Sequence, residues 1–403
     1  MSRKMKDSGI EWIGEIPEEW EIKRIKYMFN VVSGSTPKSD YFDYWDGDVI
    51  WITPADYKTL DKHIENGSRN ISKLGLRSCS TTLVPQESII FSKRAPIGTV
   101  AIAAVNLCTN QGCLSCIPQQ EVYSLFYYYV MSIATEDFEL KGSGTTFKEI
   151  STTAFNDSQL PFSPLSEQQK IALFLDKKCS EIDSLTADIQ KQIEILEQYK
   201  KSVITETVTK GLDPNVKMKD SGIEWIGEIP EEWEVISCKF CFTIYNGSDP
   251  TTKYGDTPVY GSGSKSFKTC EEYKDGPTVL LGRKGTVNIP QWIEGKYWNV
   301  DTAFDVKPKG NYNLRLFFYV AICFDYEKYS TQTALPSMTQ TDYNGFKLPY
   351  MSIEEQQHIA SYLDSKCSRL DELIRLKNQQ LETLAQYKKS LIYEYVTGKR
   401  EAI

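Results

Sequence analysis

The chain has 403 residues, of which 40% are hydrophobic, and this is enough for two domains of ordinary size. Its formal net charge is −8, its ten cysteines are scattered, and it has no apolar leader or run long enough to span a bilayer. These features exclude a disulfide-stapled secreted scaffold and a membrane partner, and they favour a cytoplasmic chain with free thiols.

A short segment near the start of the chain occurs twice. MKDSGIEWIGEIPEEWE spans 5–21 and recurs letter for letter at 218–234. Trp12, Ile16 and Trp20 lie near a proline turn within it. The segment, called the tag below, is interpreted either as an apolar anchor that pins the start of a domain to a scaffold, or as a plain core strand.

A variable block follows each tag. Block one (22–164) shows short β-like segments separated by turn residues and then a helical patch at about 121–138. Block two (235–350) repeats that order with almost no shared sequence. The order predicts an α+β domain in each half. The aromatic residues of the helical patch are interpreted as core in preference to a base-stacking platform: Tyr123, Phe126, Tyr127 and Tyr129.

Each block leads into a long predicted helix. Residues 166–210 contain no internal proline, and their apolar residues recur in a heptad, with Leu185 and Tyr199 among those expected to fill the stripe. Residues 354–397 repeat this stretch at an offset of 188, with 24 of 44 aligned positions identical. Since so long a stripe needs a partner, the two helices are predicted to pair. The predicted seam comprises Leu175, Ile182, Ile189, Leu196 and Val203 with Leu363, Leu370, Leu384 and Leu391, and Lys377 interrupts it once.

The negative net charge does not exclude DNA as a partner, because the charge is unevenly distributed along the chain. The first tag region (1–21) carries 3 basic and 6 acidic residues, and the second (212–234) carries 2 and 7, so the two hold the whole imbalance of −8. The variable blocks are close to neutral, and a basic face can therefore coexist with an acidic back.

Motifs for catalysis and metal binding are missing. GSGSKS at 261–266 is similar to a phosphate loop, but Ser264 stands where the motif needs glycine. The CxxC pairs at 113–116 and 238–241 fall at non-equivalent places, and only two histidines are present, which disfavours zinc. No acid–base pair is spaced for catalysis. We therefore predict a non-catalytic chain without a metal.

Both blocks share small polar loops that carry one or two cations. They occur at 33–39 and 246–253, and again at 92–100 and 282–287. Gly and Ser allow close approach to phosphate, and Arg can bind guanine edges, whereas ordinary solvated turns are the alternative for any single loop. The candidate DNA-contacting residues are Ser35, Thr36, Lys38, Lys93, Arg94, Lys148, Lys253, Ser264, Lys265, Arg283 and Lys284.

This arrangement resembles the DNA-specificity subunit of type I restriction-modification systems. The resemblance rests on the tag, on LP-x(5)-EQQ-x-IA at 160–172 and 348–360, and on the GxTP-like Gly34, Thr36 and Pro37. It implies two target recognition domains separated by an antiparallel coiled coil, with pseudo-twofold internal duplication. Each domain would read one half of a bipartite site on double-stranded DNA, and the coiled coil would act as the spacer.

The resemblance also implies partners. Two methyltransferase subunits would dock on the tags and helices, and motor-nuclease subunits would join them. S-adenosylmethionine and ATP would bind those partners and not this chain. Block two departs from the GxTP pattern with Asp249-Pro250.

A coiled-coil adaptor that joins two unlike proteins is the competing hypothesis, and salt-dependent binding to duplex DNA would distinguish the two. The predicted segments are tag 1–21, recognition domain 22–164, helix 165–211, tag 212–234, recognition domain 235–350 and helix 351–403.

Overall fold

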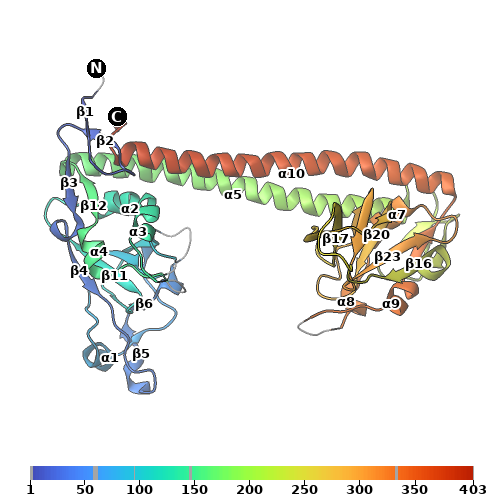
Figure 1. The fold of residues 1–403 in the computed structure, drawn as a ribbon, viewed down its shortest axis with the longest axis horizontal. Coiled ribbons are helices and arrows are strands. Elements are labelled where there is room, and N and C mark those ends of the chain that lie inside the picture. Colours follow the sequence, from blue (N-terminus) through green and yellow to red (C-terminus); the bar gives the residue numbers. More distant parts are fainter. Residues whose placement is uncertain (1–2, 58–61, 95, 145–147, 332–334, 403) are drawn as a thin grey trace. The chain divides into compact units, whose positions relative to one another are not determined.

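The chain folds into two compact units, Met1–Asp188 with Gln380–Ile403 and Ile189–Gln379 (Figure 1). Each unit contains one tag, one block and a stretch of both long helices. None of the helices in the described part of the chain is both long and apolar enough to cross a membrane. The computed structural model describes residues 3–57, 62–94, 96–144, 148–331 and 335–402.

The first unit contains the elements up to the first long helix. Its strands are β1 (Met5–Asp7), β2 (Glu15–Pro17), β3 (Glu21–Arg24), β4 (Phe29–Ser33), β5 (Trp45–Val49), β6 (Trp51–Ile52), β7 (His63–Ile64), β8 (Ile89–Ser92), β9 (Val100–Ala103), β10 (Cys108–Thr109), β11 (Cys113–Pro118) and β12 (Gln159–Phe162). Its helices are α1 (Lys73–Ser78), α2 (Ser124–Ile133), α3 (Thr135–Leu140), α4 (Thr152–Asp157) and the start of α5 (Leu165–Lys210), with 3-10 turns η1 (Ile25–Tyr27), η2 (Phe42–Tyr44) and η3 (Pro54–Asp56).

The second unit repeats this plan. Its strands are β13 (Met218–Asp220), β14 (Glu228–Pro230), β15 (Glu234–Ser237), β16 (Phe242–Asn246), β17 (Thr257–Tyr260), β18 (Lys268–Cys270), β19 (Lys274–Asp275), β20 (Thr278–Gly282), β21 (Gln291–Ile293), β22 (Lys296–Asn299), β23 (Ala303–Pro308) and β24 (Lys347–Tyr350). Its helices are α6 (Cys238–Cys241), α7 (Leu314–Ile322), α8 (Tyr326–Tyr329), α9 (Gln340–Gly345) and most of α10 (Ile353–Val396).

A common four-stranded arrangement lies at the centre of both blocks. The first block orders its sheet β4-β11-β8-β9-β7, and the second orders the corresponding sheet β16-β23-β20-β21. Neighbouring strands are antiparallel in both sheets, except that β7 runs parallel to β9. The second block adds a four-stranded sheet, β18-β17-β22-β19. The predicted α+β architecture is confirmed, with one shared framework carrying unlike sequences.

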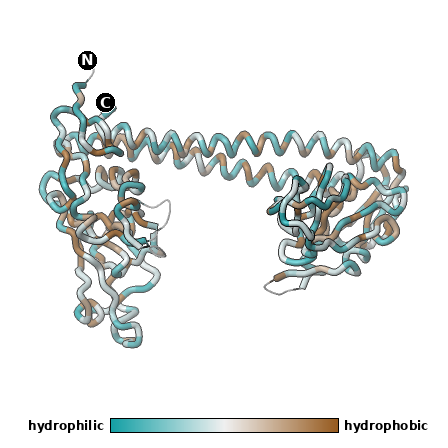
Figure 2. The backbone as a smooth tube through the Cα atoms, in the orientation of Figure 1, coloured by the Kyte–Doolittle hydropathy of each residue, from teal (hydrophilic) through white to brown (hydrophobic). Residues whose placement is uncertain are grey.

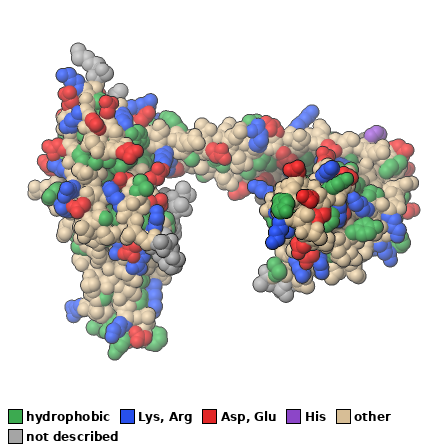
Figure 3. Space-filling view, viewed as in Figure 1, with side chains coloured by type: hydrophobic (Ala, Val, Ile, Leu, Met, Phe, Trp, Pro, Cys, Tyr) green, Lys and Arg blue, Asp and Glu red, His purple; other side chains and the backbone are tan. Residues whose placement is uncertain are grey.

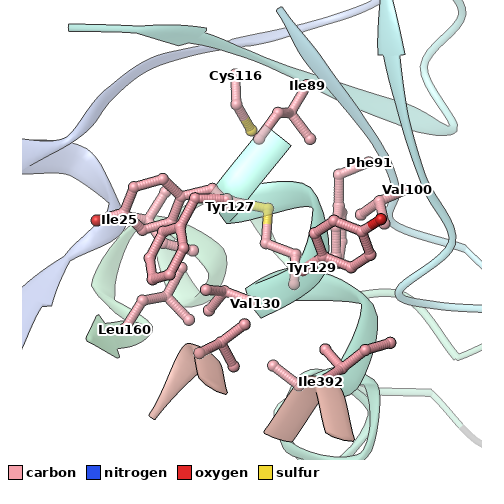
Figure 4. Packing of buried hydrophobic residues seen from close by; sticks show 14 of the residues in the cluster. Ile25, Ile89, Phe91, Val100, Cys116, Tyr127, Tyr129, Val130, Leu160 and Ile392 are labelled. Atoms are coloured by element: carbon pink, nitrogen blue, oxygen red, sulfur yellow. The ribbon is translucent and has the colours of Figure 1, made fainter. Parts of the chain in front are cut away.

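The core of the first block forms where α2 covers the sheet (Figure 4). Every residue of β8 is buried, because its IIFS sequence packs on both faces. From α2, Phe126, Tyr127 and Tyr129 are almost fully buried, and Tyr127 meets Phe29 edge to face at 5.3 Å. The interpretation of these aromatic residues as core is therefore confirmed.

Both long helices predicted from the heptad are present, and hydrophobic residues recur along each (Figure 2). In the first unit, Phe174 of α5 stacks on Tyr395 of α10 with ring centroids 4.5 Å apart. Further along α5, Asp183 pairs with Lys388 of α10 at 2.5 Å. Because the residue number rises on α5 as it falls on α10, the helices are antiparallel.

The same pairing continues within the second unit. Lys200 of α5 binds Asp371 of α10 at 2.6 Å, and Lys200 and Lys388 are equivalent under the offset of 188. Lys377, which interrupts the heptad, donates to the side-chain oxygen of Gln192. A polar contact therefore occupies the one place where the second helix lacks an apolar seam residue.

The predicted seam residues differ in burial. Leu175, Ile182, Ile189, Leu363, Leu370 and Leu391 are buried, whereas Leu196, Val203 and Leu384 are half-buried. The expectation that Leu185 and Tyr199 fill the same stripe is wrong, since they are 48% and 46% exposed. The stripe alternates steps of four and three residues, so it passes through Thr186 and Lys200, one position further on.

A duplicated glutamine fastens each block to the start of its long helix. The side chain of Gln168 is fully buried, accepts from the backbone N–H of Tyr123 at 2.9 Å and donates to the carbonyl of Ser163 at 2.8 Å. Gln356 does the same, accepting from Asn313 at 2.7 Å and donating to the carbonyl of Met351 at 2.9 Å. The glutamine of the EQQ motif thus joins helix and block in both halves.

Candidate nucleic-acid interface

One glycine-containing loop begins at the end of the first strand in the central sheet of each block. After β4, the N–H of Ser35 binds the carbonyl of Thr109 at 2.9 Å, and after β16 the N–H of Ser248 binds the carbonyl of Asn299 at 3.0 Å. A Cβ atom on Gly34 would lie 2.2 Å from the carbonyl oxygen of Thr109, and one on Gly247 would lie 2.1 Å from a backbone oxygen. Only glycine fits either position, so the two loops are built alike despite the missing GxTP pattern in block two.

A tryptophan supports each of these loops from a different strand. Trp51 of β6 donates its indole N–H to the carbonyl of Ser35 at 3.0 Å. Trp298 of β22 donates to the carbonyl of Ser248 at 2.7 Å. In both blocks the serine backbone is therefore fixed, although the supporting residue occupies non-equivalent strands.

The side chains beyond the glycine differ between the blocks. In block one Ser35 is half-buried, Thr36 and Lys38 are exposed, and the hydroxyl of Thr36 donates to Gln111. In block two Lys253 is exposed. Nearby, Thr251 and Thr252 both donate to the carboxylate of Glu272, and these hydrogen bonds lower its pKa to about 2. Those two hydroxyls hold the loop together.

The cation loops also occupy equivalent places. The N–H of Lys93 binds the carbonyl of Gly112 at 3.0 Å, and the carbonyl of Lys93 accepts from Ile150 at 3.0 Å. Arg283 repeats both contacts, to Thr302 at 2.8 Å and from Met338 at 2.9 Å. Lys93 therefore corresponds to Arg283, and Arg94 corresponds to Lys284. The loops at 92–100 and 282–287, which align only approximately in sequence, therefore occupy the same position on the framework of the two blocks.

Their electrostatic settings are unlike. Glu149 binds both Lys93 and Arg94 at 2.9 Å, and Lys148 lies exposed beside it. Burial works to raise the pKa of Glu149, but the two cations outweigh it and the pKa is lowered. The Lys93 side chain is only 13% exposed and Arg94 is 46% exposed. Block one thus holds two cations on one shared carboxylate.

In block two the corresponding cations are more open. Arg283 donates to the carbonyl of Asp301 at 3.2 Å and is 35% exposed. Lys284 is exposed and forms no ion pair with another residue of the described ranges. It forms a backbone bridge to Ser337, which stands where block one has Glu149. Block two therefore has a hydroxyl where block one has the shared carboxylate, and its nearest counter-charge is Asp301, whose carboxylate lies 3.9 Å from the Arg283 guanidinium.

Ser264 and Lys265 are exposed on the loop between β17 and β18. The N–H of Ser262 on that loop binds the hydroxyl of Thr302 at 3.3 Å, and a Cβ atom on Gly285 would lie 3.5 Å from the hydroxyl of Ser262. The loop therefore joins the surroundings of Arg283 and Lys284. On the face seen in Figure 3, basic and acidic side chains are interspersed over both blocks.

A central loop that the sequence reasoning missed connects the predicted loops in each block. In block one it is 109–112, TNQG, which binds Ser35 through Thr109, Thr36 through Gln111 and Lys93 through Gly112. In block two, NVDT at 299–302 holds Ser248 and Arg283 in the same way. The available signal was a short polar run between two β-like segments at the same place in both blocks. Each set of loops around this centre is called a loop cluster below.

Among the described residues, no group of three or more His, Cys, Asp or Glu side chains is arranged to hold a metal ion. The ten cysteines are free thiols. Burial raises the pKa of Cys113 and Cys238 to about 12, so these CxxC residues are protonated, unreactive thiols.

Comparison with known proteins identifies the family. The family model described as "Type I restriction modification DNA specificity domain" matches residues 17–195 and again 230–386. The chain belongs to this family. Two copies of the domain lie in one chain, so the internal duplication is a duplication of the specificity domain. The chain is accordingly a DNA-specificity subunit and not a catalytic one, and the adaptor hypothesis is not supported.

Several curated relatives are type I specificity subunits. The MjaIX specificity subunit of Methanocaldococcus jannaschii is 40% identical over 189 residues, which cover 46% of this chain and 43% of the relative. The putative MjaX subunit of the same organism is 26% identical over 96% of this chain and 95% of its own length. The EcoprrI subunit of Escherichia coli is 23% identical over 84% and 85%. The chain thus spans about half of the first relative and nearly all of the second.

Two solved structures share the fold. A chain from a structure on complex assembly and conformational transition of the type I restriction-modification system aligns with a TM-score of 0.76, 14% identity and coverage of 96% and 99%. The HsdS subunit from Thermoanaerobacter tengcongensis aligns with a TM-score of 0.54, 14% identity and coverage of 96% and 98%.

Proposed function

We propose that each loop cluster reads one half of a bipartite DNA site, and that the paired helices set the spacer between the halves. The observation that supports this most strongly is the duplicated framework with unlike side chains. Gly34 and Gly247 fix the same backbone, whereas Lys93-Arg94 and Arg283-Lys284 meet different charges. A shared backbone framework that carries different contact side chains in its two copies is suited to recognition of two different half-sites.

Exchange of one block tests this proposal. Replacing 22–160 by the corresponding block of a relative should change one half-site and leave the other, as seen by methylation mapping in a host that carries the chain and its methyltransferase. Replacing 235–348 should change the other half-site. A change of both half-sites after a single exchange would show that the blocks do not read DNA independently.

We further propose that the helices carry two methyltransferase docking sites. Leu185 and Leu373 are 48% and 46% exposed, Tyr199 and Tyr387 are 46% and 53% exposed, and each pair is related by the offset of 188. Lys366 lies over the Tyr199 ring at 5.4 Å. Large exposed apolar groups on charged helices mark interaction sites, and their duplication supports two copies of one partner.

The stoichiometry of the complex tests these docking sites. Tyr199→Ser and Tyr387→Ser should each reduce the number of bound methyltransferase subunits from two to one, measured by the mass of the purified complex. We propose that motor-nuclease subunits join this assembly in the cytoplasm. S-adenosylmethionine and ATP then bind the partner subunits and not this chain.

A further inference from the structure

A carboxylate on each long helix contacts the block of its own unit. Asp176 of α5 and Asp364 of α10 are equivalent under the offset of 188. Asp176 accepts from the hydroxyl of Tyr129 at 3.3 Å and pairs with Lys62. Asp364 accepts from the hydroxyl of Tyr319 at 2.7 Å and pairs with Arg315 at 2.6 Å. Both halves therefore make the same three-part contact.

The cations in these contacts come from unrelated positions. Lys62 precedes β7 in block one, whereas Arg315 belongs to α7 in block two. The backbone N–H groups of Tyr123 and Asn313 bind equivalent glutamines, so these two residues correspond to each other. Arg315 lies two residues after Asn313, and the residue at the same place in block one is Leu125. Blocks that share almost no sequence thus supply a cation to the same carboxylate by different routes. The contact is kept although the residues that make it have changed.

In block two the cation is held from several sides. The Arg315 guanidinium lies 4.6 Å from the Trp292 ring and 5.0 Å from the Phe318 ring. Trp292 belongs to β21, so the arginine connects α10, α7 and the edge of the sheet. Half-exposed pairs of this kind are weak when isolated, but a planar guanidinium between rings and a carboxylate has a defined geometry.

In block one the lysine reaches the corresponding strand, β9, which β7 separates from the edge of the sheet. The carbonyl of Lys62 accepts from the N–H of Ile102 on β9 at 2.7 Å, and its ammonium lies 5.7 Å from the Tyr129 ring. Strands β9 and β21 hold the same place in the two frameworks. Burial raises the pKa of the Tyr129 and Tyr319 hydroxyls, so both remain protonated donors.

The next aspartate on each helix has a different partner. Asp183 and Asp371 lie seven residues beyond Asp176 and Asp364. They bind Lys388 and Lys200 of the opposite long helix and not a block residue. On each long helix, one aspartate therefore contacts the block, and the aspartate one heptad later contacts the opposite helix. This difference provides matched controls on the same helices.

The geometry points to Asp176 and Asp364 as positioning residues that fix the orientation of each block on its helix, and so the alignment of its loop cluster with DNA. Gln356 already fastens the block eight residues earlier, about 12 Å along the helix. The helices and the block also share a hydrophobic core, but burial of apolar surface is non-directional, so directional polar contacts at two separated points define the orientation more sharply than one does. The inference rests on the proposed reading of half-sites, because orientation matters only if base edges are contacted in a fixed register.

Spacer selectivity is the property that tests this inference. The chain is assembled with its methyltransferase subunits, and the Kd is measured for duplexes that carry the methylation-mapped site with its natural spacer or with one base pair added or removed. Asp364→Asn should reduce the preference for the natural spacer by about tenfold, which corresponds to about 1.4 kcal/mol. Asp176→Asn should do the same, and Tyr319→Phe should have a smaller effect in the same direction.

The controls separate positioning from general stability. Asp371→Asn and Asp183→Asn should keep the wild-type spacer preference, and Asp364→Glu should restore most of it. A wild-type preference in Asp364→Asn and Tyr319→Phe would overturn the inference. An equal loss of affinity for every duplex would also overturn it, because that is the result of a purely structural role. A wild-type complex without any site preference would instead refute the proposed function.

Discussion

Trp20 donates its indole N–H to the carboxylate of Glu167 across 2.8 Å, and Trp233 repeats the bond to Glu355 across 3.1 Å. Both tryptophans are almost fully buried, and Arg3 binds the same Glu167 carboxylate from the other side. The tag is therefore an anchor on the start of the long helix, with the glutamate of the EQQ motif as its attachment. This contact decides between the two interpretations of the tag.

The first prediction concerns this anchor. Trp20→Phe keeps the ring but removes the donor, and it should lower the free energy of unfolding by about 1–3 kcal/mol because a charged acceptor loses a partner. Trp12→Phe is the matched control, since the buried indole N–H of Trp12 has no hydrogen-bond partner among the described residues. Chemical denaturation of both variants measures the difference. Equal losses in the two variants would show that ring packing, and not the bond to Glu167, holds the tag.

The second prediction concerns Arg283. If its guanidinium binds a base edge, Arg283→Ala should cost about 1–3 kcal/mol of binding and relax one position of one half-site. Contact with phosphate alone would weaken binding to all sequences and reduce the salt dependence. Lys328→Ala is a suitable control, because Lys328 pairs with Glu224 of the tag at 3.3 Å. Unchanged affinity in both Arg283→Ala and Arg94→Ala would place DNA on another face.

The third prediction exploits the charge difference between the loop clusters. Glu149→Gln should release Lys93 and Arg94, raising the affinity for non-specific DNA and steepening its decline with salt. Ser337→Glu should have the opposite effect, because it places a carboxylate beside Arg283 and Lys284. Titrations at several salt concentrations give both slopes. If the two substitutions leave the slopes unchanged, these cations do not neutralise phosphate.

The fourth prediction is that the isolated chain binds no S-adenosylmethionine. None of its motifs matches a cofactor fingerprint, and Gly34 and Gly247 of the loop clusters lie against backbone carbonyls instead of forming an open cradle. Isothermal calorimetry with the purified chain should show no heat of binding, whereas its methyltransferase partner under the same conditions should show saturation. Stoichiometric binding to this chain alone would refute the prediction.

Periodic sequence features predicted the fold better than they predicted the surface. The heptad and the repeat at an offset of 188 predicted both helices and their pairing, because apolar periodicity directly reflects burial. Their antiparallel direction was implied only by the resemblance to the family. In the sequence, Ser166 followed by Gln169 resembles a capping box, but α5 begins at Leu165 and places Ser166 inside its first turn. The phase of the stripe was also misjudged at Leu185 and Tyr199, since steps of three and four residues give similar patterns over a short window.

The loop clusters were predicted only in part, for a physical reason. Glycine positions such as Gly34 were recognisable, because a close backbone approach tolerates no side chain. The pairing of Glu149 with Lys93 and Arg94 depends on the return of a distant segment to the same strand edge. Local sequence contains no information on such a long-range contact, and the same holds for the choice of Lys62 and Arg315 as partners of Asp176 and Asp364.

The last prediction tests the helices as a ruler. Helix α5 has 46 residues and, at about 1.5 Å per residue, is about 69 Å long. Four residues inserted within 186–192 would lengthen it by about 6 Å, which corresponds to about one to two base pairs. They would also interrupt the seven-residue repeat with a four-residue step, which locally unwinds a coiled coil, so a matching insertion at 374–380 should help restore pairing with α10.

Methylation mapping of the double insertion should therefore show unchanged half-sites and a spacer longer by about one or two base pairs. The single insertion should lengthen the spacer to the same extent as the double insertion does. It should also lower the stability of the chain, because the contact between Lys377 and Gln192 and the seam around Ile189 must rearrange. Asp183 and Asp371 lie outside the inserted stretches, so their pairs with Lys388 and Lys200 should survive and keep both ends of the rod in register. A stable, active double insertion with the original spacer would mean that the distance between half-sites is set by something other than these helices.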